Sequence, residues 1–333
     1  MQGAERAAGC AGGDLDRDRR EARDKEVHVP VLPEEVVAAL AGELPDEHDG
    51  WFVDGTCGAG GHTRSLLEAA PGVRVLALDQ DPDALDLART NLAVFGDRVR
   101  LRRARLSQLA RTIRKERIGR PLGVLFDLGV CSLHLDRPER GFSFLADGPL
   151  DMRMDPDRPR TAADIVNTWD ESDLADLFYF EGGESGARRI ARAIVEARRR
   201  TPFQRTGGLA EIVSRATGRA GGRTHPATRT FQALRRAVNE EGDELLGGLA
   251  AADHWLADGG RLAVISFHSG EDRAVKHFLQ RGGREERWDI LTRKPLTASR
   301  TEVRGNRRAR SALLRAAERL RGRPHQSKGG GES

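Results

Sequence analysis

The 333-residue chain has few cysteines and no long apolar segment. Cys10, Cys57 and Cys131 lie far apart and form no CxxC pair, which excludes a disulfide framework and a cysteine-rich zinc site. None of the nine histidines falls into a pattern such as HExxH, so we expect no bound metal ion. No apolar run approaches the roughly 20 residues that span a bilayer, and the N-terminus has no signal-peptide core. We therefore expect a cytoplasmic protein with no membrane partner.

Lysine is also scarce, because only five of the 55 basic residues are lysine and the rest are arginine. Residues 136–184 carry thirteen acids against five arginines. Residues 187–236 carry thirteen arginines against two glutamates, and residues 300–323 carry nine arginines against two acids. Arginine binds phosphate bidentately and stacks on bases, so these blocks favour a nucleic-acid partner. A solvated arginine-rich surface explains the composition equally well.

The hydrophobic pattern predicts an α/β protein, because short apolar runs alternate with helical segments, as in a doubly wound sheet. We expect strands over residues 51–54, 74–79, 98–102, 123–128, 261–266, 288–293 and 311–316. We expect helices over residues 61–70, 82–94, 106–116, 171–180, 187–200, 228–256 and 271–280.

The alternation stops between residues 136 and 225, where loops rich in glycine, proline and aspartate precede helical segments. This break predicts an inserted, mostly helical domain within a sheet domain made of residues 27–135 and 226–321. Residues 1–26 and 322–333 lack apolar periodicity, and we expect them to be mobile tails.

The segment Val53–His62 (VDGTCGAGGH) is a strand that enters a glycine-dense turn and then a helix. It lacks the GK[ST] of a P-loop, and Thr63 stands where the third glycine of a dinucleotide fingerprint belongs. Asp79 ends the second strand, 24 residues after Gly55, where a carboxylate can accept both hydroxyls of a ribose. The pattern favours a nucleoside-containing cofactor, either a dinucleotide or S-adenosylmethionine, over a tight turn beside a solvent-facing aspartate.

Several longer motifs occur in order along the chain: HVPVL (28–32), DGTCGAGGHT (54–63), ERGFSF (139–144), DGPLDMRMD (147–155), HPATRTFQALR (225–235), SFHS (266–269) and RARS (308–311). Together they resemble the MraW/RsmH family of S-adenosylmethionine-dependent methyltransferases. The resemblance covers nearly all of residues 28–319. It implies a class I (Rossmann-like) methyltransferase fold with an inserted helical domain, and S-adenosyl-L-methionine as cofactor. It further implies methylation of the N4 amino group of a cytosine in small-subunit (16S) ribosomal RNA near the decoding centre.

The resemblance also implies site residues. The cofactor positions that match are Gly60, Gly61, His62, Asp79 and Asp127, and two further cofactor positions, Leu106 and His134, depart from the family. Leu106 replaces the usual phenylalanine, so adenine keeps an apolar contact but loses a ring face. His134 stands where the family usually has a glutamine-like residue, and it can still form one hydrogen bond. For His62, a polar role at the start of its helix is an equal alternative.

We expect Asp127 and His268 to be catalytic residues. Each follows a strand of the parallel sheet, at the edge where open α/β sheets bind ligands. Asp127 is the candidate acceptor for the amino group of cytosine, and its match to the cofactor site leaves open that it only holds the methionine end. Phe142 and Phe144 either stack a base, close over the cofactor or anchor their loop.

Two other functions remain open from the sequence: an N-methyltransferase that acts on DNA or protein, and a non-catalytic ribosome-assembly factor. The intact glycine turn together with Asp79 argues against the second. The sequence carries no signal for an oligomeric state.

Overall fold

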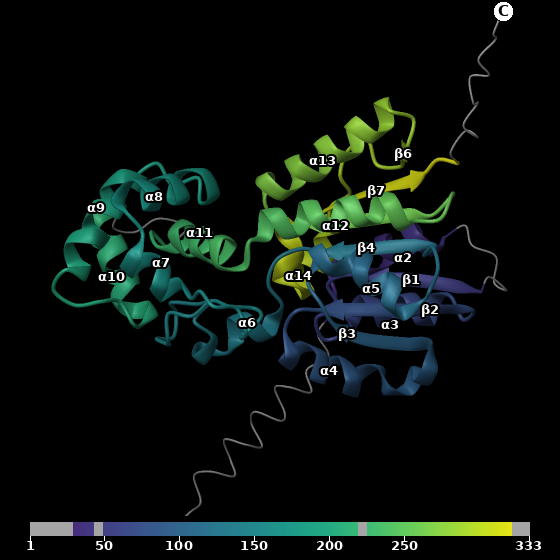
Figure 1. Cartoon of the computed structure of the whole chain (residues 1–333), viewed down its shortest axis with the longest axis horizontal. Coiled ribbons are helices and arrows are strands. Elements are labelled where there is room, and N and C mark those ends of the chain that lie inside the picture. Colours follow the sequence, from purple (N-terminus) through teal and green to yellow (C-terminus); the bar gives the residue numbers. More distant parts are fainter. Residues whose placement is uncertain (1–28, 43–48, 219–224, 322–333) are drawn as a thin grey trace, which may run out of the picture.

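The computed structural model describes residues 29–42, 49–218 and 225–321, so the tails expected at residues 1–26 and 322–333 lie outside it. A seven-stranded sheet with the order β3-β2-β1-β4-β5-β7-β6 forms one half of the molecule (Figure 1). Its strands are β1 (Gly50–Asp54), β2 (Val73–Asp79), β3 (Val99–Arg103), β4 (Gly123–Asp127), β5 (Arg261–Ser266), β6 (Trp288–Ile290) and β7 (Leu313–Arg319). β1 to β5 pair in parallel, whereas β7 pairs antiparallel with both β5 and β6. The predicted α/β class is confirmed.

The strand expected over residues 288–293 is three residues shorter in the structure. β6 ends at Ile290 rather than at residue 293, because the amides of Leu291 and Thr292 both donate to the carbonyl of Ala316. Two residues facing one partner interrupt the regular ladder, as in a β-bulge.

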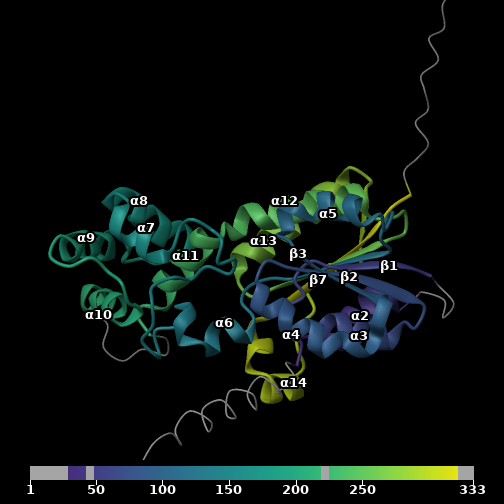
Figure 2. The ribbon, with the colours of Figure 1, turned by 60° about the horizontal axis from the view of Figure 1, so that its bottom comes forward.

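Helices cover both faces of the sheet (Figure 2). One face carries α2 (Pro33–Ala41), α3 (Gly61–Ala69) and α4 (Pro82–Leu92); the other carries α5 (Leu109–Glu116), α12 (Glu241–Trp255) and α13 (Ser269–Arg284). A hydrophobic cluster lies on each face of the sheet, and successive side chains of β1 and β4 alternate between them. Phe52 and Leu125 pack on the face that carries α2, α3 and α4. Val53 and Phe126 pack on the face that carries α5, α12 and α13. Burial on both faces explains why these strands are almost continuously apolar.

The remaining short elements connect these layers. They are α6 (Ser132–Asp136), α14 (Arg300–Gly305) and the 3-10 turns Ala93–Arg98, Leu106–Gln108, Pro138–Arg140 and Arg307–Ser311. The segment expected to be helical over residues 106–116 therefore begins as a 3-10 turn before it continues as α5.

A second group of helices packs around its own core, to one side of the sheet (Figure 1). It comprises α7 (Ala162–Thr168), α8 (Glu171–Asp176) with the π-helical turn Leu177–Glu181, α9 (Ala187–Arg198), α10 (Thr206–Thr217) and α11 (Thr228–Asn239). Ile165, Phe178, Ile190, Leu209 and Leu234 are fully buried there.

The helix predicted over residues 228–256 is in fact two helices. α11 ends at Asn239, Glu240 adopts the left-handed region with φ 51°, and α12 begins at Glu241. The buried Asn239 amide causes the break, because it donates to the carbonyl of Met152 and accepts from the amide of Met154, both at 2.8 Å. Since α11 packs in the core of the helical group, we propose that the insert extends over residues 136–239 instead of ending at 225.

Candidate active site

A cavity of about 420 Å³ opens at the ends of β1 to β5, beside α11 and α12. Its volume lies in the range of roughly 300–1,000 Å³ that is typical of small-molecule sites. The lining includes most of the predicted site residues: Gly61, His62, Asp79, Leu106, Asp127, His134 and His268. Gly60 does not line the cavity, and the backbone conformation explains why a glycine stands at this position. Its φ is 92°, and a Cβ there would lie 2.8 Å from the Leu92 side chain.

The glycine turn after β1 forms one wall of this cavity. A Cβ on Gly55 would come within 2.8 Å of both Phe126 and Leu106, so only glycine allows these side chains to close against the turn. Gly58 has φ 52° and donates its amide to Asp79 Oδ2 at 2.7 Å. The hydrogen bond between Gly58 and Asp79 therefore fixes the glycine turn relative to the carboxylate at the end of β2.

The Asp79 carboxylate is fixed by the backbone on both oxygens. Its other oxygen, Oδ1, accepts the amide of Asp81 at 2.9 Å. Burial raises the pKa of Asp79, and the two amide bonds only partly oppose this rise. Each carboxylate oxygen can accept a further hydrogen bond, so the group suits a pair of ligand hydroxyls.

The buried His62 and the partly exposed Asp127 form a pair in the lining of the cavity. His62 is 5% exposed, and its Nε2 lies 3.5 Å from Asp127 Oδ2. Among the described residues, neither the two ring nitrogens of His62 nor Asp127 Oδ1 has a hydrogen-bond partner. Burial alone would lower the pKa of His62, but the carboxylates of Asp127 and Asp54 outweigh it and raise that pKa. An unsatisfied buried polar atom costs about 1–3 kcal/mol, so these atoms indicate a place for a ligand.

Asp54 is a residue of this site that sequence reasoning missed. It is fully buried and does not line the cavity; its carboxylate accepts from Thr63 Oγ1 at 2.7 Å and from the amide of Thr56 at 3.1 Å. Burial raises the pKa of Asp54 to about 6. A carboxylate at the end of an otherwise apolar strand is the signal that could have identified it.

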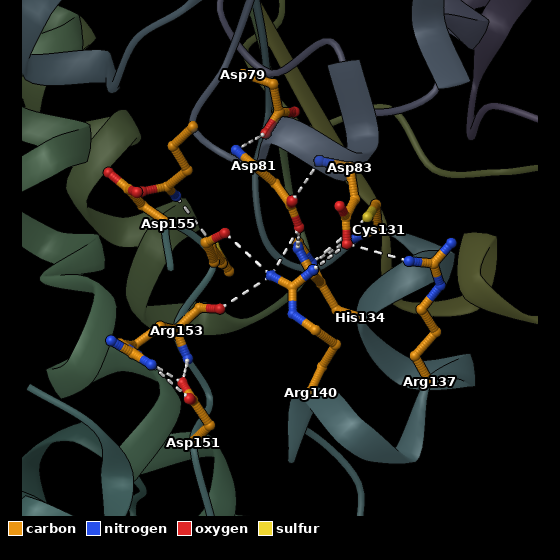
Figure 3. A network of polar contacts seen from close by, with 12 residues as sticks. Asp79, Asp81, Asp83, Cys131, His134, Arg137, Arg140, Asp151, Arg153 and Asp155 are labelled. Atoms are coloured by element: carbon orange, nitrogen blue, oxygen red, sulfur yellow. Dashed lines mark hydrogen bonds and ion pairs between the residues drawn. The ribbon is translucent and has the colours of Figure 1, made fainter. Parts of the chain in front are cut away.

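A further network joins α4, α6 and the insert (Figure 3). The buried Asp81 carboxylate receives His134 Nε2 at 2.7 Å and Arg140 Nη2 at 2.8 Å. Arg140 also contacts Asp83 at 3.2 Å and donates to the carbonyl of Met154, which lines the cavity. The network therefore connects the insert to the residue whose amide holds the cofactor-site carboxylate.

Comparison with known proteins agrees with this geometry. The model of the MraW methylase family matches residues 25–320. The chain belongs to this family. It is 50% identical over 295 residues to "Ribosomal RNA small subunit methyltransferase H" of Synechococcus elongatus, covering 88% of this chain and 95% of the relative. It is 49% identical over 310 residues to a protein of the same name from Methylobacterium sp., covering 88% and 90%.

Membership of the MraW methylase family confirms the resemblance found in the motifs, and with it the methyltransferase class and the cofactor, S-adenosylmethionine. The residues present fit this cofactor. Its positive charge suits a cavity edged by Asp79 and Asp127, its ribose suits Asp79, and Leu106 offers an apolar surface for its adenine. In the parts of the chain that the structure describes, no cluster of side chains could hold a metal ion and no helix could cross a membrane.

Two predicted site residues of this MraW-family chain already have partners within the protein. His134 has Asp81 at Nε2, Cys131 Sγ at 3.5 Å from Nδ1, and Phe142 stacked on its ring at 4.7 Å. His268 caps α13, because its Nδ1 accepts the amides of Gly270 and Glu271. The cofactor contact of His134 and the catalytic role of His268 stay predictions.

The two phenylalanines of the ERGFSF motif anchor their loop. Phe142 is buried against His134, and Phe144 packs on His225 and Phe231 with ring centroids 4.5 and 4.9 Å away. The structure therefore favours loop anchoring over base stacking for both rings.

The protonation of His134 makes the stability of the protein depend on pH. Burial alone would lower the pKa of His134, but the hydrogen bond to Asp81 raises it from 6.5 to about 9. The stabilisation by the imidazolium is thus complete below pH 6.5 and is lost as the pH rises through about 9. We expect the free energy of unfolding to fall by on the order of 2 kcal/mol over this interval. Urea titrations at constant ionic strength measure it.

His134→Gln is the matched variant for this titration, because glutamine keeps a hydrogen-bond donor for Asp81 but carries no titrating proton. Its free energy of unfolding should change much less between pH 6.5 and 9. Parallel curves for the two proteins would show that His134 does not carry the effect.

Proposed function

We propose that this chain transfers a methyl group from S-adenosylmethionine to the N4 amino group of a cytosine in 16S ribosomal RNA of the small subunit, near the decoding centre. The observation that carries the proposal is the His62–Asp127 pair, which lines the cavity and in which both ring nitrogens of His62 and Asp127 Oδ1 have no hydrogen-bond partner in the described residues. The names of the relatives, which are small-subunit ribosomal RNA methyltransferases, support the class of substrate.

The cofactor, when bound, supplies a methyl group already activated by its sulfonium centre. The protein has to orient the attacking nitrogen, which is a weak nucleophile because its lone pair is delocalised into the cytosine ring. The Asp127 carboxylate, which lines the cavity, is the acceptor for one N–H of this amino group. That hydrogen bond favours the pyramidal nitrogen needed for attack and gives the proton a place to go.

His62 and Thr56 hold Asp127 for this task. The raised pKa of His62 favours the imidazolium, whose Nε2 lies 3.5 Å from Asp127 Oδ2 and holds the carboxylate in place. Thr56 Oγ1 accepts the backbone amide of Asp127 at 2.6 Å and fixes the residue at the end of β4. In this proposal Asp127 contacts the amino group and His62 positions it.

The direct test uses labelled S-adenosylmethionine and small ribosomal subunits from cells that lack the modification. After the reaction, the RNA is digested to nucleosides, which are separated by chromatography. We expect the label in N4-methylated cytidine, and no incorporation into subunits that already carry the modification. Label in another nucleoside, in DNA or in protein would contradict the proposal. Binding of subunits without any transfer would favour a non-catalytic assembly factor.

A further inference from the structure

Two adjacent aromatic side chains of the insert lie in solvent. Tyr179 and Phe180 are 58% and 73% exposed, and their rings touch edge to face with centroids 5.1 Å apart. Their neighbours Leu177 and Phe178 are buried in the core of the insert. Leaving a large ring in water forgoes about 1.5–3 kcal/mol of burial energy, so two such rings side by side need an explanation.

The pair stands on a turn that is bonded to a residue of the active-site cavity. Both rings stand on the π-helical turn Leu177–Glu181, a geometry that is frequent at functional sites. Arg236 of α11 binds the carbonyl of Glu181 and lies 2.8 Å from its carboxylate. Arg236 also lines the active-site cavity, and Figure 1 shows α11 leading from the insert to α12 on the sheet. One ion pair therefore separates the aromatic turn from the rim of the active site.

Beside the pair is a groove of about 700 Å³ that is lined by two arginines and two carboxylates. Arg188 and Arg189 line it and are exposed; Arg189 donates only to a carbonyl, and Arg188 has no ion-pair partner in the described part of the chain. Glu184 is buried and accepts a backbone amide. Asp176 is thus the one carboxylate among the groove-lining residues that is neither buried nor bonded in the structure.

We propose that Tyr179 and Phe180 stack unpaired bases of the RNA that flanks the target cytosine, while Arg188 and Arg189 contact its phosphates. Aromatic rings next to arginines are the combination that binds single-stranded nucleic acid, because the rings take the bases and the guanidinium groups take the backbone. This assignment rests on the proposed function, since a cytosine must leave its stack to enter the cavity and its neighbours then lose stacking partners. Arg188 and Arg189, which have no carboxylate partner in the described part of the chain, favour RNA over a protein partner.

The test compares two fluorescent RNA oligonucleotides of about twelve nucleotides, one with all its bases and one with abasic central positions. Binding is measured by anisotropy with the full chain. We expect Tyr179→Ala/Phe180→Ala to bind the complete oligonucleotide at least about fivefold more weakly, the lower end of the range for one stacked base. The abasic oligonucleotide should bind the variant and the unmodified protein equally, because its phosphate contacts are unchanged.

Two control variants keep the result interpretable. Tyr179→Phe/Phe180→Trp retains both rings and should bind like the unmodified protein, which separates stacking from a folding defect. Val94→Ala removes an exposed apolar side chain from the sheet half of the molecule and should change nothing. Equal binding of the complete oligonucleotide by the alanine variant would overturn the inference. So would a variant that loses affinity for small subunits but not for the oligonucleotide, because that result indicates a protein partner.

Different results would contradict the stacking surface and the proposed reaction. If the unmodified protein methylates small subunits and the aromatic variant binds RNA normally, the stacking surface is wrong and the reaction stands. If no methylated cytidine forms but affinity still depends on the bases and on both rings, the surface binds RNA and the proposed reaction is wrong.

Discussion

Replacement of Asp127 by asparagine is expected to lower the rate constant for methyl transfer by roughly 100- to 10,000-fold, the usual contribution of a positioned acid or base. Asparagine keeps the size of the side chain, but it offers only one acceptor oxygen and no negative charge beside His62. Single-turnover rates with saturating cofactor and small subunits measure the change. Asp258→Asn, an exposed carboxylate elsewhere, should leave the rate unaltered.

The affinity for the cofactor distinguishes the two roles open to Asp127. If the residue accepts the proton of the amino group, calorimetry should give a cofactor dissociation constant within about tenfold of the unmodified protein, that is within about 1.4 kcal/mol. If it only holds the methionine end, the dissociation constant should rise strongly and the rate at saturation should recover. The second pattern would reject Asp127 as the acceptor.

Replacement of Asp81 by asparagine is expected to destabilise the protein by about 3–5 kcal/mol, the usual cost of removing one partner from a buried ion pair. The variant leaves His134 and Arg140 buried without their shared carboxylate. Urea denaturation at pH 7 measures the change, and circular dichroism checks that the variant is folded.

A surface pair on the same helix gives the control for Asp81. Asp86 is 71% exposed and pairs with Arg89 one turn away, and exposed pairs contribute at most about 1 kcal/mol. Asp86→Asn should therefore move the urea midpoint only slightly. Equal shifts for the two variants would show that the Asp81 network does not stabilise the fold. Asp81→Asn should also weaken the pH dependence, because without the carboxylate the pKa of His134 falls.

Much of the fold could be predicted because its signals are local. Apolar runs such as Gly123–Asp127 identify buried parallel strands, and the glycine turn after β1 fixes the register of strand and helix. The ends of parallel strands meet at one edge, which is why Asp79 and Asp127 line one cavity although they lie far apart in sequence.

The parts that could not be predicted depend on contacts between distant segments. Glu240 is a good helix former, so nothing local marks the break between α11 and α12. The cause is the Asn239 amide, which bonds a loop more than 80 residues earlier in the chain. Asp81 is recognisable as a helix cap before Pro82, but its burial between His134 and Arg140 arises only once the insert has folded against α4.

The order of strands in the sheet also determines when the protein can complete its folding during its own synthesis. β4 leaves the ribosome long before β5, its parallel neighbour, because the whole insert, which includes α11, and then α12 lie between them in the sequence. Until β5 arrives, the apolar strand β4 presents an open hydrogen-bonding edge, the kind of surface that promotes aggregation and attracts chaperones. β7 is synthesised last, yet it lies between β5 and β6. A chain interrupted before Leu313 would therefore expose the edge of β5 and leave β6 without a partner in the sheet.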